Sequence, residues 1–186
     1  MEIDYPTLET ERLLLRPFSE AEVEPLFALM QDTDVMRYVG DRRVPTLQDT
    51  WRSVSSWIGH WALRGYGQWA IEERGSGDVI GRAGLINPVD WPGAEVGYLL
   101  GRRWWGRGYA TEAAGAAMSW GFRTIGFDRL IRLIDPANAP SIAVAVRLGE
   151  TLQGETELWS NRVLVYGIDR DEWRALQAPE GIHASD

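Results

Sequence analysis

The chain has 186 residues, of which 45% are hydrophobic and 25% are charged, values typical of one soluble globular domain with a substantial core. Its formal net charge of −8 argues against nucleic acid as a general partner, and no uninterrupted apolar run is long enough to predict a membrane span. The lack of cysteine excludes disulfides, thiolate metal sites and a cysteine nucleophile, and together with an acidic N-terminus that lacks a signal core it predicts a cytoplasmic protein.

The N-terminal part of the chain predicts one strand and two helices. Residues 8–16 have the pattern of a strand. Ser19 and Glu22 have the spacing of a capping box, and the apolar residues behind them repeat with helical spacing, which predicts a helix over about 20–30. A second helix is predicted over about 47–64, where the glycines of "GYG" end it.

The remainder of the chain alternates further strands and helices. A hairpin is predicted around "GSG", at residues 75–77, and a second hairpin around Ser160 and Asn161. The predicted strands are 67–74, 78–86, 94–100, 128–135, 154–159 and 161–168, and the predicted helices are 109–125 and 139–149. This order predicts a mixed α/β fold in one domain, residues 1–177, with a central sheet covered by helices. Residues 178–186 are predicted to form a loose tail.

The segment "GRRWWGRGYATEA", residues 101–113, combines three features that favour an anion. It connects a strand to a helix, whose first N–H groups have no partners within the helix and point outward. Gly106 and Gly108 let a ligand approach the main chain, and Arg103 and Arg107 can bind phosphate oxygens. The alternative is a tight turn that carries surface arginines. The segment lacks the Gly-Lys-Ser/Thr of a Walker loop, and Thr111 replaces the third glycine of a dinucleotide fingerprint.

The pattern that fits is Arg-x-x-Gly-x-Gly before a helix, at Arg103, Gly106 and Gly108, which resembles the acyl-CoA pyrophosphate loop of the GNAT acetyltransferases. The surrounding "EVGYLL" and "WWGRGYATEA" resemble the RimJ/RimL-type branch, which acetylates protein N-termini. "TERLLLRPFSEAE" and "ANAPSIAVAVRLG" resemble further segments of that branch, so the likeness covers residues 7–173. It implies a mostly antiparallel sheet with a splayed pair of strands and helices on both faces.

The resemblance implies acetyl-CoA as the acetyl donor and CoA as the product. The end of the strand before the loop would pair with pantetheine, and main-chain N–H groups of the loop and of the helix start would hold the pyrophosphate. Asn138 and Ser141 match family positions near the pantetheine arm, and Arg147 could meet the 3′-phosphate; the alternatives for Asn138 and Ser141 are a loop residue and an N-cap. The implied cofactor-binding residues are Tyr98, Leu99, Leu100, Arg103, Trp105, Gly106, Arg107, Gly108, Tyr109, Ala110, Thr111, Asn138, Ser141 and Arg147.

The chemistry has to be direct transfer from the thioester to an amine, because the chain has no cysteine. Glu95, before the loop, is the candidate base, directly or through water, and its alternative role is an ordinary strand carboxylate; Asp90 is a second candidate. Ser141 is the candidate donor to the leaving sulfur. Many GNAT enzymes carry a tyrosine acid where this sequence has Ala145, and Glu150 replaces a common aromatic residue.

The acceptor is expected to be a primary amine, either a protein N-terminus or a small molecule, and Arg37, Tyr38 and Trp69 are candidate contacts. The acidic chain suits a cationic acceptor such as a polyamine or an aminoglycoside. A non-catalytic acyl-CoA sensor and a phosphate-binding protein unrelated to CoA remain alternatives. Neither a metal site nor a nucleic-acid or membrane partner is predicted, and both a monomer and a homodimer are possible.

Overall fold

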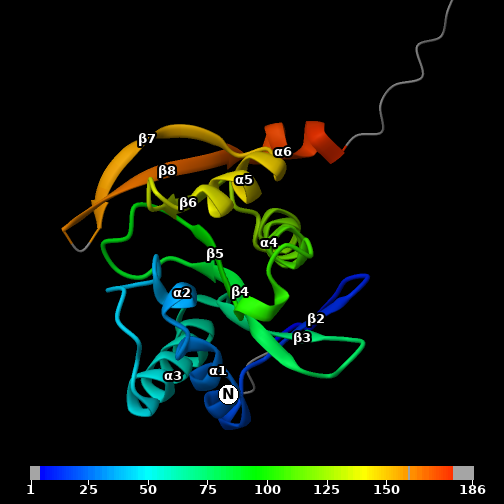
Figure 1. Cartoon of the computed structure of the whole chain (residues 1–186). Helices are drawn as coiled ribbons and strands as arrows, with labels where there is room; N and C mark the ends of the chain where they lie inside the picture. The colour runs from blue at the N-terminus through cyan, green and yellow to red at the C-terminus, as the bar shows by residue number, and fades with distance from the viewer. Residues whose placement is uncertain (1–4, 159, 178–186) are drawn as a thin grey trace, which may run out of the picture.

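The computed structural model describes residues 5–158 and 160–177, which form a twisted eight-stranded sheet flanked by helices (Figure 1). The strand order is β1-β2-β3-β4-β5-β6-β8-β7, and neighbouring strands are antiparallel except for β5 and β6. The strands are β1 Leu8–Glu9, β2 Leu13–Arg16, β3 Gln68–Glu73, β4 Val79–Ile86, β5 Glu95–Leu100, β6 Arg129–Ile134, β7 Thr151–Leu158 and β8 Asn161–Asp169. The predicted mixed α/β fold is therefore confirmed.

The helices begin and end largely where local sequence signals place them. Ser19 and Glu22 form the predicted capping box, and Gly65 ends the long helix in the left-handed conformation. The α-helices are α1 Val23–Met30, α2 Thr33–Met36, α3 Leu47–Arg64, α4 Tyr109–Trp120, α5 Ala139–Arg147 and α6 Arg170–Gln177. Single-turn helices precede α1 and follow β5, at Glu20–Glu22 and Arg102–Trp104, and a π-helical turn, Gly121–Ile125, extends α4.

Three local predictions need correction. The predicted first strand is interrupted, so that β1 and β2 pair with each other as a short hairpin. Residues 33–36, for which no element was predicted, form α2, which Asp32 caps by accepting a hydrogen bond from the Asp34 N–H. Helix α6 was not predicted, although the Glu172 carboxylate accepts a hydrogen bond from the Asp169 N–H at its start. The predicted tail, residues 178–186, lies outside the described residues.

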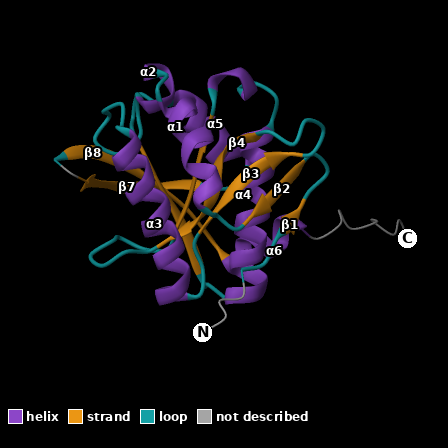
Figure 2. Ribbon diagram, turned by 90° about the horizontal axis from the view of Figure 1, so that it is seen from below, coloured by secondary structure: helices purple, strands orange, loops and turns teal. Residues whose placement is uncertain are grey.

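The two faces of the sheet bury different sets of side chains because strand residues alternate in direction. Ala70 and Leu99 pack with apolar residues of α1, α2 and α3, whereas Trp69, Val96 and Leu100 belong to the cluster that contains the buried face of α4. Figure 2 shows the helices on both sides of the strands. The cluster around Trp69 also holds Trp61, whose ring centroid lies 4.9 Å from that of Trp69.

The parallel pair β5 and β6 separates almost immediately. The register contains one pair of residues, Glu95 and Ile131, and the Ile131 N–H donates to the Ala94 carbonyl at 2.9 Å. Beyond this point each strand pairs only on its outer side, β5 with β4 and β6 with β8. The splayed strands implied by the sequence are therefore present, and the gap between them is open to a ligand.

Glu150, where the resemblance led us to expect an aromatic residue, forms a buried ion pair with Arg132 of β6. The Arg132 Nη2 lies 2.7 Å from the Glu150 Oε1, and the two side chains are 3% and 1% exposed. The Arg132 Nε also donates to both carboxylate oxygens. The ion pair thus takes the place of apolar packing between β6 and the end of α5.

We predict that Glu150→Ala lowers the free energy of unfolding by about 3–5 kcal/mol, because it leaves the Arg132 guanidinium buried without a counter-charge. Urea unfolding followed by circular dichroism measures the change. The double variant Arg132→Met/Glu150→Leu should lose much less, since neither charge remains. Equal losses in the single and double variants would contradict this account of the pair.

Candidate active site

A cavity of about 1430 Å³ lies between the separated strands and continues toward α2 and the β7–β8 hairpin. Its walls include β5 residues 95–100, the start of α4, and the start of α5. Because α4 follows β5 and α5 follows β6, both helices begin near the same end of the parallel pair. Two helix N-termini therefore border one cavity, an arrangement that favours a bound anion.

The start of α4 has unused hydrogen-bond donors. The first helical bond runs from the Glu112 N–H to the Gly108 carbonyl, so the N–H groups of residues 109–111 precede it. Gly108 occupies the N-cap position with φ +81° and has no side chain to cap these groups. Gly106 has φ +73°, and an added Cβ would meet no atom within 4 Å. The loop is therefore open and rich in donors, which fits a pyrophosphate group.

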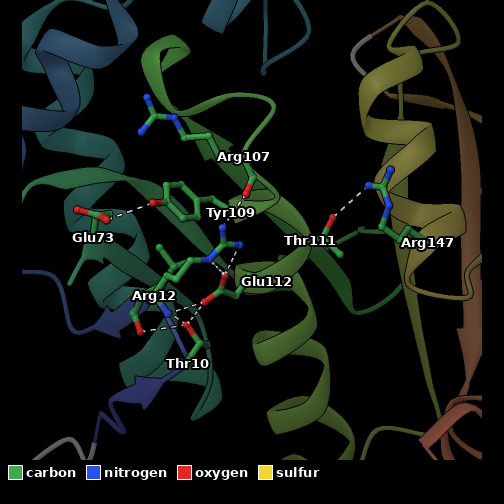
Figure 3. Close-up of polar contacts among 9 residues, drawn as sticks. Thr10, Arg12, Glu73, Arg107, Tyr109, Thr111, Glu112 and Arg147 are labelled. Carbon is green, nitrogen blue, oxygen red and sulfur yellow. Dashed lines mark hydrogen bonds and ion pairs between the residues drawn. The ribbon is translucent and has the colours of Figure 1, made fainter. Parts of the chain in front are cut away.

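An ion pair from Arg12, in the turn between β1 and β2, holds this loop in place (Figure 3). Arg12 donates from Nε to the Glu112 carboxylate at 2.7 Å and from Nη1 to the Arg107 carbonyl at 2.8 Å. The Thr10 hydroxyl and the Arg12 N–H also donate to the Glu112 carboxylate. The Arg12 guanidinium lies over the Tyr109 ring, at 4.6 Å from the centroid. Sequence reasoning missed this anchor, because its two halves lie about a hundred residues apart.

The arginine side chains of the loop do not lie where we expected them. The Arg103 Nη2 pairs with Asp78 at 2.9 Å, and its guanidinium stacks on Trp104. Neither Arg103 nor Arg107 lines the cavity with its side chain, and Figure 3 shows Arg107 extending away from the Arg12–Glu112 pair. Arg147 does line the cavity, and its Nη1 donates to the Thr111 hydroxyl at 3.3 Å. Of these three arginines, Arg147 alone faces a ligand in the cavity.

Most of the remaining candidate ligand-binding residues line the same cavity. Asn138 caps α5 by accepting from the Ser141 N–H at 3.2 Å, which makes Asn138 the N-cap rather than Ser141. The Trp105 indole donates to the Leu100 carbonyl at 2.8 Å and so occupies one main-chain acceptor at the end of β5. The candidate residues that line the cavity are Arg37, Tyr38, Glu95, Tyr98, Leu99, Leu100, Trp105, Gly106, Gly108, Tyr109, Ala110, Thr111, Asn138, Ser141 and Arg147.

The structure corrects two candidate positions, Trp69 and Asp90. Trp69 has no exposed surface, and its indole donates to the Pro6 carbonyl, so Trp69 belongs to the core and not to the acceptor groove. Asp90 is exposed on the loop before β5 and does not line the cavity. Ala145, at the position of the family's tyrosine acid, is fully buried.

Glu95 lies at the point where the strands separate. Its Oε1 accepts from the Leu133 N–H of β6 at 3.4 Å, and its Oε2 accepts from the Trp91 indole at 2.7 Å. Burial raises the pKa of Glu95 from its ordinary 4.5 to about 7, although the hydrogen bonds from Trp91 and Leu133 and the charges of Arg132 and Arg82 act to lower it. A carboxyl group with a pKa near neutrality can exchange a proton with a bound amine.

The fold combines a gap between two parallel strands with a glycine-rich loop at a helix N-terminus, and both border one cavity. Residues 12–151 match the family model described as an acetyltransferase (GNAT) domain, and the chain belongs to this family of acetyltransferases. It is 34% identical to the uncharacterized protein YkkB of Bacillus subtilis, over 86% of this chain and 93% of the relative. It is 30% identical to the uncharacterized N-acetyltransferase p20 of Bacillus licheniformis, over 80% of this chain and 84% of the relative.

Solved structures agree with this assignment. The acetyltransferase from Agrobacterium tumefaciens superposes with a TM-score of 0.79 at 32% identity, covering 90% of this chain and 96% of the other. The ribosomal-protein-S5-alanine acetyltransferase from Vibrio fischeri has a TM-score of 0.74 at 17% identity, covering 90% and 98%, which is a likeness of fold. In the described part of the chain, no helix has the length and apolar character to cross a membrane, and no group of three or more His, Asp or Glu side chains could hold a metal ion.

We predict that Glu95→Gln stabilises the protein above neutral pH. The folded protein keeps the Glu95 proton up to a pKa of about 7, whereas the unfolded chain releases it near 4.5. The free energy of unfolding of the wild type therefore falls as pH rises from about 4.5 to 7. Above pH 7 the ionised Glu95 lowers it by about 3 kcal/mol in total. Urea unfolding at several pH values should show an advantage of the variant that grows across this window. An advantage independent of pH would mean that Glu95 has an ordinary pKa.

Proposed function

We propose that the protein is an acetyl-CoA-dependent N-acetyltransferase that transfers the acetyl group directly to a primary amine. The observation that carries this proposal is the position of Glu95, a buried carboxyl group with a raised pKa, at the base of the gap between β5 and β6. The same cavity reaches the glycine loop at the start of α4. A proton acceptor and an anion-binding loop thus open into one space, as a transfer from a CoA thioester to an amine requires.

The residues of the loop fit the phosphates of CoA. The N–H groups that precede the first helical bond of α4 would hold the pyrophosphate, with Gly106 and Gly108 allowing close approach. Arg147 and Thr111 lie beside this helix start and would add donors for a phosphate group. The free edge of β5 beyond Glu95 offers main-chain groups to the pantetheine amides. The bound thioester supplies an activated acetyl group.

The protein's own residues then manage the protons. Glu95 accepts a proton from the acceptor ammonium, directly or through one water, so that the free amine can attack the thioester carbonyl. A main-chain N–H on the free edge of β5 stabilises the negative oxygen. The C–N bond would then form and the C–S bond break. The attacking nitrogen would release its second proton, which balances the proton that the departing sulfur would receive through a neighbouring hydroxyl. The Ser141 hydroxyl, which makes no hydrogen bond among the described residues and lines the cavity, is the proposed donor to the sulfur.

The acceptor side of the cavity is formed by α2 and by the β7–β8 hairpin. Arg37 and Tyr38 follow α2 and line the cavity, with Arg37 paired to Asp34. We propose both residues as acceptor contacts. The likeness to a ribosomal-protein acetyltransferase supports a protein N-terminus as one possible acceptor class, with small amines as the other.

We predict that Gly106→Ala weakens acetyl-CoA binding at least about tenfold, because a methyl group would stand where the main chain must approach a phosphate. Calorimetric titration with acetyl-CoA and CoA measures the loss. Gly77→Ala is a matched control: Gly77 has φ +75°, compared with +73° for Gly106, and both positions have free space around an added Cβ, but Gly77 lies in the β3–β4 turn. The backbone strain is therefore similar, and a similar weakening in both variants would show that strain rather than contact causes it.

We predict that Glu95→Gln lowers kcat for acetyl transfer at least about a hundredfold, since the amide cannot accept the proton of the ammonium. Release of free CoA thiol in the presence of an amine panel measures the rate. For the wild type, kcat/KM should rise with pH through an apparent pKa near 7, and this limb should disappear in Glu95→Gln. If the wild type binds acetyl-CoA but releases no thiol with any amine, the protein is an acyl-CoA sensor and not an enzyme.

A further inference from the structure

Two polar side chains on the floor of the cavity have no part in the transfer chemistry. Gln68 of β3 and Arg82 of β4 both line the cavity, and the Arg82 Nη1 donates to the Gln68 Oε1 at 2.9 Å. In the sheet register Gln68 lies opposite Gly84, Gly84 opposite Gly97, and Ile86 opposite Glu95. Cross-strand partners, and residues two apart on one strand, have side chains on the same face of the sheet. Gln68 and Arg82 therefore lie on the same face as Glu95.

Arg82 is unlike most other arginines of the cavity because it has no carboxylate partner. Five other arginines that line the cavity each form an ion pair with a carboxylate. The pairs are Arg12–Glu112, Arg37–Asp34, Arg42–Asp135, Arg102–Asp34 and Arg132–Glu150. Within the described residues, Arg82 makes no such pair; its guanidinium stacks on the Trp57 ring, 4.9 Å from the centroid. Arg147, also without a carboxylate, lies on the CoA side of the cavity beside Thr111.

Arg82 is half-buried and its Nε is enclosed without a hydrogen-bond partner, so the unpaired charge carries a desolvation cost that a ligand could offset. Burial lowers the pKa of Arg82 to about 10, although the charge of Glu95 acts to raise it. Arg82 therefore remains charged at neutral pH. A buried cation is normally paired with an anion, because a lone charge in a poorly solvated site is strongly unfavourable. The chain leaves the position of that anion open.

Gln68 borders the same cavity and carries an unpaired amide donor. Its side chain is 1% exposed, and its Nε2 has no hydrogen-bond partner among the described residues; the Arg82 Nε likewise has none. Since the Gln68 Oε1 accepts from Arg82, the Nε2 is directed elsewhere. The nearest atom to an added Cβ on Gly97 is this Nε2, at 4.0 Å, so the unpaired donor lies beside Gly97, which also lines the cavity.

We infer that Arg82 and Gln68 form a carboxylate-binding subsite, so that the acceptor is an amino acid or a similarly small compound carrying both an amine and a carboxylate. A guanidinium and an amide NH₂ are suitable donors for the two carboxylate oxygens. Gly97 is two residues from Glu95, about 7 Å along β5, so one end of the acceptor lies at Glu95 and the other at Arg82 and Gln68. This inference rests on the proposed acetyltransferase function and narrows its acceptor.

The inference disfavours two acceptors that the acidity of the chain suggested. Polyamines and aminoglycosides carry no carboxylate and would place another cation beside Arg82. A protein N-terminus presents a neutral peptide carbonyl where a free amino acid has its carboxylate. Amino-acid amides imitate that N-terminus, so a comparison of acids with amides separates the two acceptor classes.

The experiment uses matched acceptor pairs with the purified full chain. Glycine, β-alanine, γ-aminobutyrate, alanine and leucine are each compared with their carboxamides, and kcat/KM for thiol release is measured with acetyl-CoA in excess. In parallel, calorimetry measures the binding of each compound to the protein saturated with CoA, which requires no turnover. The variants are Arg82→Met and Gln68→Met, with Arg52→Met as the control, because Arg52 is an exposed arginine of α3 outside the cavity.

We expect at least one carboxylate to exceed its amide by about tenfold or more in kcat/KM and in affinity. Arg82→Met should bring this ratio close to one, Gln68→Met should lower it less, and Arg52→Met should leave it unchanged. Acetyl transfer without a preference for carboxylates would overturn the inference and leave the acetyltransferase proposal intact. Selective carboxylate binding without transfer would support the subsite and refute the proposed enzyme. If no pair shows selective binding in the wild type, the inference fails, whether or not the variants fold.

Discussion

The site depends on one constraint, namely that β5 and β6 pair at a single position and then separate. A continuous parallel pair would satisfy the facing main-chain groups of both strands and leave no cavity. Here the Glu95 carboxylate accepts the Leu133 N–H where the next strand pairing would have formed, so one side chain takes over part of the lost hydrogen bonding. The same carboxylate is thereby buried, and burial raises its pKa to about 7. The opening of the sheet and the reactivity of its candidate base thus have one structural origin.

The separated ends of β5 and β6 lack the hydrogen bonds of a continuous sheet. Two ion pairs, one partly exposed and one buried, stabilise the segments around them. Arg12, in the turn between β1 and β2, binds Glu112 of α4 and the Arg107 carbonyl, which fixes the glycine loop without occupying its N–H groups. Arg132 and Glu150 join β6 to the chain after α5 in a fully buried setting. The charge of Glu150 is therefore balanced by Arg132 on the neighbouring strand, and the pair closes the β6 side of the gap.

The sequence permits prediction of those features that depend on neighbouring residues. Capping signals and glycines placed the helices α1, α3, α4 and α5, and the alternation of apolar residues placed most strands. The glycine loop could be predicted because strand, loop and helix follow one another in the chain. Asn138 and Ser141 were proposed from the family resemblance, and they line the same cavity as the loop. Trp69 was wrongly assigned to the acceptor groove. Strand alternation places Trp69 and Gln68 on opposite faces of the sheet, and only the packing shows that Trp69 is on the core face. Arg12 was missed because its partner Glu112 lies a hundred residues further along the chain, in α4. Gln68 and Arg82 were missed because their contact depends on the register of β3 and β4, which the sequence pattern does not specify.

The charges around the cavity suggest how a common fold obtains a particular acceptor. The loop and the free edge of β5 would serve any acyl-CoA, and neither distinguishes one amine from another. Discrimination has to come from the opposite wall, where α1, α2 and α3 cover the sheet and where Arg82 stacks on Trp57. Five of the seven arginines that line the cavity are paired with carboxylates. The net charge of the whole chain therefore does not determine the electrostatic potential within the cavity. The charge of Arg82, unpaired within the described residues, contributes a local positive field at one end of the acceptor space, while Glu95 offers a proton acceptor at the other. A compound with an amine and a carboxylate can satisfy both ends together, whereas a compound with only cationic groups can satisfy one.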